Sequence, residues 1–178
     1  VMASKIKVDT LETANGSGTI ALSNQLSGMT SASMPSGSVL QVVSATFGTN
    51  TATTSTSFIN TPVALSITPT STSSKILIMV SAPMYAANAG TYAARFTIFR
   101  GNVSGVNLGD SSLGFGNQWS STGGTSLSVT ASMSFLDSPS TTSSQAYTVG
   151  IRSEGNNSAA TIMQSNAKAT ITLMEIQG

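Results

Sequence analysis

Residues 126–135 read SLSVTASMSF, and apolar and polar side chains alternate along them without exception. Successive side chains of a β-strand point to opposite faces, so a period of two predicts a strand with one buried face and one polar face. The same alternation returns at residues 63–68, 147–152 and 168–173. No amphipathic helical pattern persists along the chain, so the pattern of 126–135 indicates an all-β fold.

Two other stretches carry large side chains on both faces. Residues 75–82, KILIMVSA, are almost continuously apolar, and residues 92–100, YAARFTIFR, place Phe96 and Phe99 on opposite sides. A sheet with one solvent face does not need such strands. We therefore expect a loop, a second sheet or a neighbouring subunit to cover the second face of each.

The last strand changes phase near its end. Ala169, Ile171 and Leu173 share one face, whereas Met174 and Ile176 fall on the other, which predicts a β-bulge or a bend between them. Clusters of Ser and Thr separate the strands and are typical of turns. These patterns together predict an antiparallel β-sandwich or jelly roll of about seven or eight strands, here called the head.

The head is predicted to span residues 39–178, and residues 1–38 differ from it. Apolar residues are too few there for an independent core, and 15–18, NGSG, has the composition of a tight turn. We interpret residues 1–38 as an extended attachment arm that contains a short hairpin. A frayed terminus is the alternative interpretation.

The amino-acid composition excludes most catalytic mechanisms and metal sites. The 178 residues include no His and no Cys, only 7% are charged, and the formal net charge is +1. The usual general base, thiol nucleophiles and tetrahedral zinc sites are thereby removed, so we predict no enzyme, no catalytic residues, no cofactor and no metal. The enzymatic alternatives are a glycosidase that pairs two of the loop carboxylates, which are Asp110, Asp137 and Glu154, a Ser–Lys dyad and a catalytic tyrosine.

The charge pattern also bears on partners and location. Seven cations are dispersed and matched by six acids, so we expect no nucleic-acid partner. No apolar run approaches the roughly 20 residues of a membrane span, and no signal peptide opens the sequence, so we expect a soluble protein made in a cytoplasm without a membrane partner.

Aromatic side chains mark the candidate binding surfaces. Residues 101–124 form a long Gly-rich stretch that holds Trp119, the single Trp, together with Phe115. An aromatic plate beside amide side chains suits sugar stacking, and Tyr85 and Tyr92 form a second candidate of the same kind. The alternative is that Trp119 packs beneath its own loop or in a subunit interface.

Several blocks resemble one family. Residues 3–25, ASKIKVDTLETANGSGTIALSNQ, resemble the N-terminal segments of small fibre, decoration and tail-fibre-like virion surface proteins of tailed phages, especially cyanophages. The β-rich distal domain of the same proteins is similar to the following blocks: SGSVLQVVSATF (36–47), SITPTSTSSKILIMVSA (66–82), RFTIFRG (95–101), SFLDSPSTTSSQAYTVGIRS (134–153) and ATITLMEIQG (169–178).

The resemblance implies a homotrimer on the virion surface, with an N-terminal attachment segment and a jelly-roll-like head that faces outward. The lead hypothesis is a capsid decoration or cement protein, or a short head fibre, made in the host cytoplasm. Its arm would contact the major capsid protein or another virion protein through Lys5, Ile6, Lys7, Val8 and Leu11. The alternative is a tail-fibre or receptor-binding protein that attaches to a host cell-surface polysaccharide through its loop aromatics.

Overall fold

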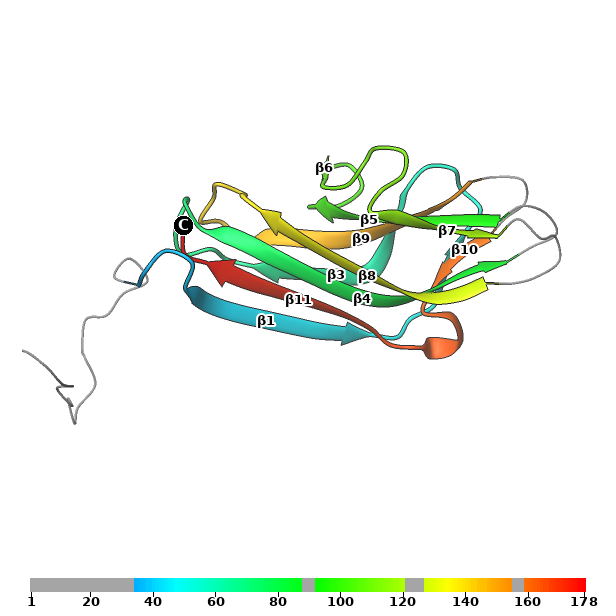
Figure 1. Cartoon of the computed structure of the whole chain (residues 1–178), viewed down its shortest axis with the longest axis horizontal. Helices are drawn as coiled ribbons and strands as arrows, with labels where there is room; N and C mark the ends of the chain where they lie inside the picture. Colours follow the sequence, from blue (N-terminus) through cyan, green and yellow to red (C-terminus); the bar gives the residue numbers. More distant parts are fainter. Residues whose placement is uncertain (1–33, 88–91, 121–126, 155–158) are drawn as a thin grey trace, which may run out of the picture.

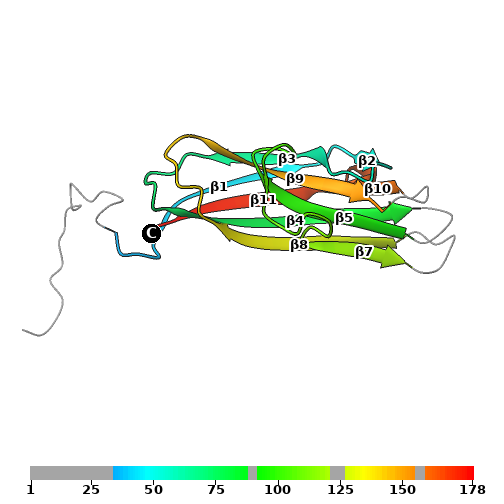
Figure 2. The same ribbon diagram turned by 90° about the horizontal axis from the view of Figure 1, so that it is seen from above.

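The computed structural model describes residues 34–87, 92–120, 127–154 and 159–178, which form two antiparallel β-sheets (Figure 1). The strands of both sheets run along the long axis of the molecule (Figure 2). Residues 1–33, which hold most of the predicted arm and the hairpin predicted at 15–18, lie outside the described residues.

Each sheet is four main strands wide. In order across the first sheet, the main strands are β1 (Val39–Phe47), β11 (Ala169–Ile176), β4 (Lys75–Ala87) and β8 (Leu127–Asp137). Two short strands belong to the same sheet: β10 (Ala159–Ile162) pairs with the second half of β4, and β2 (Thr51–Thr53) pairs with β10. The second sheet consists of β3 (Ile59–Ile67), β9 (Gln145–Ser153) and β5 (Tyr92–Arg100), followed by β6 (Val106–Asn107) and β7 (Gly116–Ser120), which both pair with the far edge of β5.

The connections define a jelly roll. The strands of five or more residues are, in chain order, β1, β3, β4, β5, β7, β8, β9 and β11. Numbered one to eight, they lie in the order 1-8-3-6 in the first sheet and 2-7-4-5 in the second. Each sheet thus alternates strands from the two halves of the chain, as two Greek keys rolled together require. The predicted all-β, jelly-roll-like sandwich is confirmed.

The core lies between the sheets, and the alternating residues fill it as predicted. Tyr147, Val149 and Ile151 of β9 are fully buried in the second sheet, and Ala131 and Met133 of β8 are buried in the first, while Ser132 between them is exposed. The remaining side chains of this core include Val63, Ile67, Ile76, Ile78, Val80, Met84, Ile98, Ile162, Ile171 and Leu173.

The change of phase predicted near the end of the last strand is wrong, and the register shift in the pairing of β11 with β1 lies in β1, between Val39 and Gln41. β11 keeps regular pairing with β4 from Thr170 to Ile176, so the residue that follows Ala169, Ile171 and Leu173 on the core face is Glu175, which is fully buried. Met174 and Ile176 lie on the outer face because the alternation never changes phase. The prediction failed because it assumed that apolar side chains mark the inner face throughout.

The two strands that carry large side chains on both faces, β4 and β5, differ in what covers the outer face. On the outer face of β5, Arg95, Thr97 and Phe99 are buried beneath residues 101–115 of the same chain. Within that segment, the backbone N–H groups of Leu108 and Phe115 donate to carbonyls of β5 at 2.9 Å. A neighbouring subunit is therefore not required there. On β4, by contrast, the described residues leave the outer face open, and Met79 is 38% exposed.

Candidate functional site

A row of apolar side chains crosses the outer face of the first sheet. Val42 of β1 lies opposite Met174 of β11. Met174 in turn lies opposite Leu77 of β4, and Leu77 lies opposite Leu136 of β8. Directly paired residues of neighbouring strands point to the same face. These four side chains, here called the apolar row, therefore span the sheet from one edge to the other.

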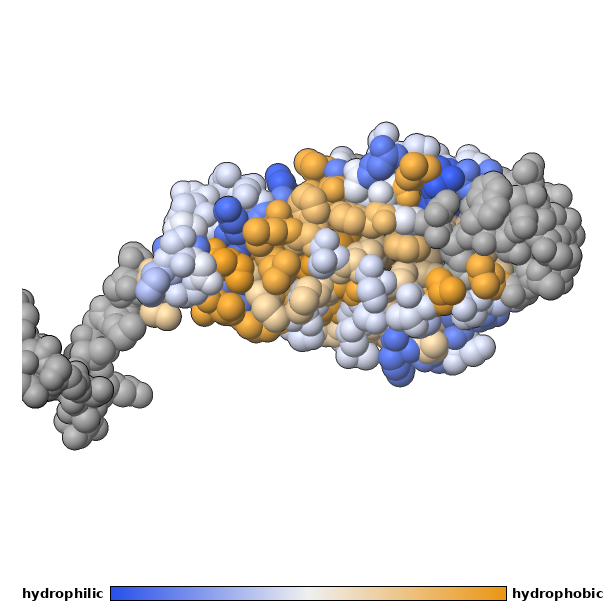
Figure 3. All heavy atoms as spheres, viewed as in Figure 1, coloured by the Kyte–Doolittle hydropathy of each residue, from blue (hydrophilic) through white to orange (hydrophobic). Residues whose placement is uncertain are grey.

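The apolar row is open to solvent at both edges. Val42 is 52% exposed and Leu136 is 48% exposed. Val39 and Met79 are exposed on the same face, whereas Ser and Thr predominate farther along the strands. Figure 3 shows hydrophobic residues gathered toward the end of the molecule where the C-terminus lies. Contiguous apolar surface of this kind marks an interaction site on a soluble domain.

The N-terminal segment joins the head beside this patch. The Gly37 N–H donates to the Gln177 carbonyl at 2.8 Å, and the Gln177 N–H donates to the Ser38 carbonyl at 2.8 Å. These two bonds place residues 34–38 next to the end of β11 (Figure 1). Residues 34–38, where the described part of the chain begins, therefore lie at the same end of the head as the apolar row.

Buried polar groups lie at the same end of the core. The Glu175 carboxylate accepts hydrogen bonds from the Gln41 side-chain amide at 2.5 Å and from the backbone N–H and hydroxyl of Thr70 at 2.7 and 2.8 Å. Burial opposes its ionisation, but the hydrogen bonds, that from Gln41 first, outweigh burial and hold the pKa of Glu175 below its usual value.

A second buried carboxylate has a charged partner. Asp137 accepts two hydrogen bonds from the Arg100 guanidinium, at 2.8 and 2.5 Å, and one from the Tyr147 hydroxyl at 2.7 Å. Burial of the phenol, followed by its bond to Asp137, raises the pKa of Tyr147, so this hydroxyl stays protonated as a donor. The cluster joins the two sheets where β8 ends.

A third cluster fixes the loop that covers β5. Glu154 pairs with Arg95 and with Arg152, the latter at 2.7 Å. The hydrogen bond from Arg95 is the main cause that lowers the pKa of Glu154. Asp110 accepts backbone N–H bonds from Leu113 and Ser112, at 2.6 and 2.8 Å, and these bonds lower its pKa. Both carboxyl groups are therefore ionised, and their role is to hold the neighbouring residues in place.

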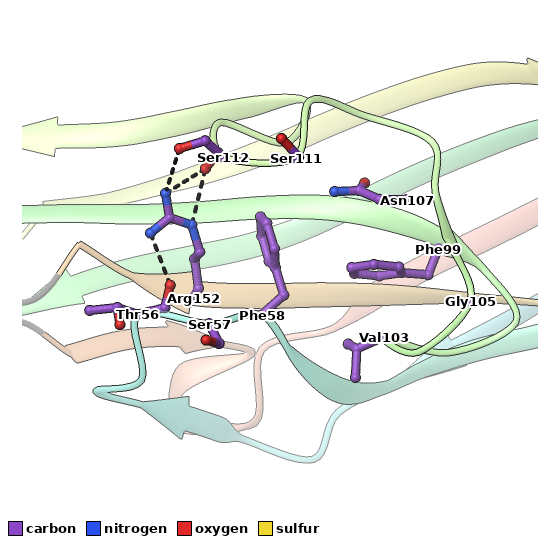
Figure 4. A pocket seen from close by; sticks show the side chains of 10 residues that line it. All are labelled: Thr56, Ser57, Phe58, Phe99, Val103, Gly105, Asn107, Ser111, Ser112 and Arg152. Carbon is purple, nitrogen blue, oxygen red and sulfur yellow. Dashed lines mark hydrogen bonds between the residues drawn. The ribbon is translucent and has the colours of Figure 1, made fainter.

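A groove of about 570 Å³ lies between this loop and the outer face of the second sheet (Figure 4). Phe58 and Phe99 lie within it with ring centroids 5.8 Å apart in an edge-to-face arrangement. Arg152 closes one end, with its guanidinium carbon 5.5 Å from the Phe58 ring centroid. The remaining lining residues are Thr56, Ser57, Val103, Gly105, Asn107, Ser111 and Ser112.

The aromatic residues singled out from the sequence lie on different surfaces. Phe115 is half-buried and packs edge-to-face on Phe135, with centroids 5.7 Å apart. Tyr85 lies on β4, in the first sheet. Trp119 and Tyr92 lie on the paired strands β7 and β5, and their side chains are outside the described part of the structure. Neither Phe115 nor Tyr85 lines the groove at Phe58.

Residues 101–124 are not one irregular loop. They contain β6 and β7, so the long connection predicted there is divided by two strands that pair with β5. The predicted arm contacts Lys5, Ile6, Lys7, Val8 and Leu11 lie outside the described residues. The groove was missed because Phe58 and Phe99 are brought together only by the order of strands in the second sheet.

The three loop carboxylates do not form a glycosidase site. Asp137 is bound to Tyr147 at the start of β9, whereas Glu154 follows the end of that strand. Seven residues of extended chain separate these positions by about 23 Å, far more than a glycosidase pair allows. Asp110 and Glu154 both have lowered pKa values, whereas a general acid needs a raised one.

The described residues also show whether the chain holds a metal cluster or a membrane-spanning helix. Within residues 34–87, 92–120, 127–154 and 159–178, no three acidic side chains lie close enough to hold a metal ion. In the same described ranges, no helix is long and apolar enough to cross a membrane.

The strand order defines the class as a jelly-roll β-sandwich, and known proteins were compared on that basis. No family model matches the chain, and no curated protein matches it. A mutant VP2 protein of infectious bursal disease virus, from derived T=1 particles, is 10% identical with a TM-score of 0.37, and the match covers 78% of this chain and 37% of that chain.

A structure of the Gt strain of infectious bursal disease virus is 11% identical with a TM-score of 0.32, and this match covers 79% of this chain and 39% of that chain. The chain thus spans less than two fifths of either one. This is a distant structural likeness to a protein of virus particles, and at these scores it carries no functional argument.

Proposed function

We propose that this chain is a structural protein of a tailed-phage virion, a trimeric capsid decoration or cement protein or a short head fibre that docks through its N-terminal arm. The observation that carries the proposal is the apolar row, Val42, Leu77, Leu136 and Met174, at the end of the head where the arm joins. The sequence resemblance supplies the virion context and the number of copies.

Contact between copies at the apolar row removes this surface from water. Lys75 is the only charged residue among the described positions on the outer face of the four main strands of the first sheet, so three such faces can gather around a three-fold axis with little like-charge repulsion. A cyclic arrangement of the copies then gathers the three arms at one end. The opposite end of each head, where β4 finishes and β8 begins, faces away from the particle (Figure 1).

In this arrangement the arm supplies attachment. Charged and apolar residues alternate over Lys5, Ile6, Lys7 and Val8, and Leu11 follows three residues later. This pattern suits addition of a strand to an exposed sheet edge. The partner is the major capsid protein or another virion protein. The tail-fibre alternative uses the same head but places it on the tail, so the location of the protein on the particle distinguishes the two.

The oligomeric part is tested by light scattering on the full chain. The wild type is expected at three times the chain mass of 18.0 kDa. Val42→Asp and Leu136→Asp, which alter exposed positions, are expected to give monomers because a charge in an apolar contact lacks a partner. Ser66→Asp, at an exposed position on the outer face of β3 in the second sheet, is the matched control. A monomeric wild type contradicts the proposal.

A further inference from the structure

We propose that the groove at Phe58 and Phe99 is a binding site for an uncharged saccharide. The site is independent of the oligomer proposed above, because it lies on the outer face of the second sheet and the apolar row lies on the first. It also differs from the aromatic surfaces that the sequence indicated. Its volume of about 570 Å³ falls within the ~300–1,000 Å³ typical of small-molecule sites.

The floor of the groove is aromatic and fixed. Phe99 lies against Gly150 so closely that a Cβ added there would be 2.6 Å from Phe99 Cε2. Phe58 meets Phe99 edge-to-face at an interplanar angle of 74°. An aromatic ring presents a negative face that attracts the weakly positive C–H groups of a sugar ring. Phe58, which is partly exposed, offers such a face, whereas Phe99 is only 5% exposed and supports the Phe58 ring. Figure 4 shows both rings beside the space bounded by Val103 and Asn107.

The electrostatics of the groove disfavour an anionic ligand. The Arg152 Nε and Nη1 atoms donate to the Ser112 and Thr56 carbonyls at 3.0 and 3.1 Å, and Nη2 pairs with Glu154. The guanidinium donors are thus already hydrogen-bonded within the protein, and Glu154 balances the charge. Arg152 is therefore not available for bidentate binding of a phosphate or carboxylate. No other charged side chain belongs to the described lining of the groove.

The rim supplies uncharged hydrogen-bonding groups. Thr56, Ser57, Ser111 and Ser112 contribute hydroxyls, whereas the Asn107 amide is already bonded to Thr97, Gly109 and Asp110. Aromatic floor and neutral polar rim together match a molecule that has apolar C–H faces and hydroxyls at its edge, which is the chemistry of a neutral sugar. A purely apolar ligand would leave these rim groups without partners.

The groove is also preformed. The Val103 N–H donates to the Asn60 side-chain oxygen at 2.9 Å, and the Thr148 hydroxyl donates to the Gly101 carbonyl at 2.6 Å. The start of the loop is therefore tied to β3 and β9, and Ser112 at the other end of the groove is tied to Arg152 of β9. A site that needs no ordering on binding loses less conformational entropy.

The test is saturation-transfer difference NMR on the full chain, with saturation of the aromatic protons. The probes are the methyl glycosides of glucose, mannose, galactose and N-acetylglucosamine, with methyl glucuronide as the charged comparison. We expect transfer to the ring protons of at least one neutral glycoside. Ser111→Trp, at an exposed lining position, is expected to weaken that binding by about tenfold or more because the indole fills the groove.

Two controls separate blockage from unfolding. Thr142→Trp places the same side chain at an exposed position in the β8–β9 connection and is expected to bind as the wild type does. Phe58→Leu keeps apolar bulk and removes the ring, and it is expected to lose the transfer while retaining the melting temperature within a few degrees. No transfer to any neutral glycoside, equal transfer in Ser111→Trp, or stronger transfer to the glucuronide would overturn the proposal.

Discussion

Glu175 and Asp137 lie at the same level of the first sheet, on either side of Ile76. Glu175 of β11 pairs with Ile76 of β4, and Ile76 pairs with Asp137 of β8. All three side chains are buried on the core face. The core therefore closes, at the end where the arm joins, with two carboxylates that are held in different ways, one by neutral donors and the other by Arg100.

The Glu175 site predicts acid sensitivity. Because the folded-state pKa of Glu175 lies below its unfolded value, its contribution is complete above pH of about 4.5 and is lost as pH falls through the folded pKa. Glu175→Gln is expected to lower the unfolding free energy at pH 7 by about 1–3 kcal/mol. Urea titrations at pH 7 and pH 3 measure both effects. The variant should lose less stability than the wild type between these pH values, and an equal loss would contradict the assignment.

The Asp137 cluster predicts unequal effects of its two partners. Tyr147→Phe removes one of three hydrogen bonds to Asp137 and is expected to cost about 1–2 kcal/mol. Arg100→Met leaves a buried carboxylate without its cation and is expected to cost about 3–5 kcal/mol. Chemical unfolding of both single variants tests the order. If Tyr147→Phe cost more than Arg100→Met, the cation would not be the main stabilising partner.

Two glycines provide a matched test of the loop over β5. Gly114 has φ of +65°, and a Cβ there would lie 2.2 Å from the Phe96 carbonyl oxygen, whereas at Gly116 the nearest atom is Phe96 Cζ at 3.4 Å. Gly114→Ala is expected to cost about 2 kcal/mol or more and Gly116→Ala much less. Hydrogen exchange of the Phe115 N–H, which donates to Phe96, should accelerate only in the first variant. Unchanged exchange there would show that the loop does not depend on this close approach.

Removal of the arm tests its separation from the head. A chain that begins at residue 34 keeps the bonds between residues 37–38 and Gln177 and is expected to retain the circular dichroism and melting temperature of the full chain. It is also expected to remain trimeric, because the apolar row is intact, and to lose binding to virus particles. Particle binding by the shortened chain, measured by co-sedimentation with empty capsids, would contradict the role of the arm.

Strand positions were predictable from the sequence because the period of two is a local signal. The stretch 126–135 maps onto β8, and 147–152 lies within β9. The failure at Glu175 has a physical cause, since a charged residue is rarely buried without a cation. The unbroken alternation from Ala169 to Glu175 is the signal that would have found it.

The cover of β5 and the groove could not be predicted, because both depend on contacts between residues far apart in the sequence. A strand with two large faces looks the same whether its own chain or a second subunit covers it. Phe58 and Phe99 meet only because β3, β9 and β5 are neighbours in the second sheet. Such juxtapositions follow from topology and not from any local pattern.

The virion role is tested most directly by locating the chain on particles. Virions that carry this chain are labelled with gold-conjugated antibody raised against residues 101–115, the segment that covers β5, and are imaged by electron microscopy. A capsid decoration protein or head fibre predicts label spread over the head. Label confined to the tail would contradict that role and favour the receptor-binding alternative, and particles without label would contradict a virion role altogether.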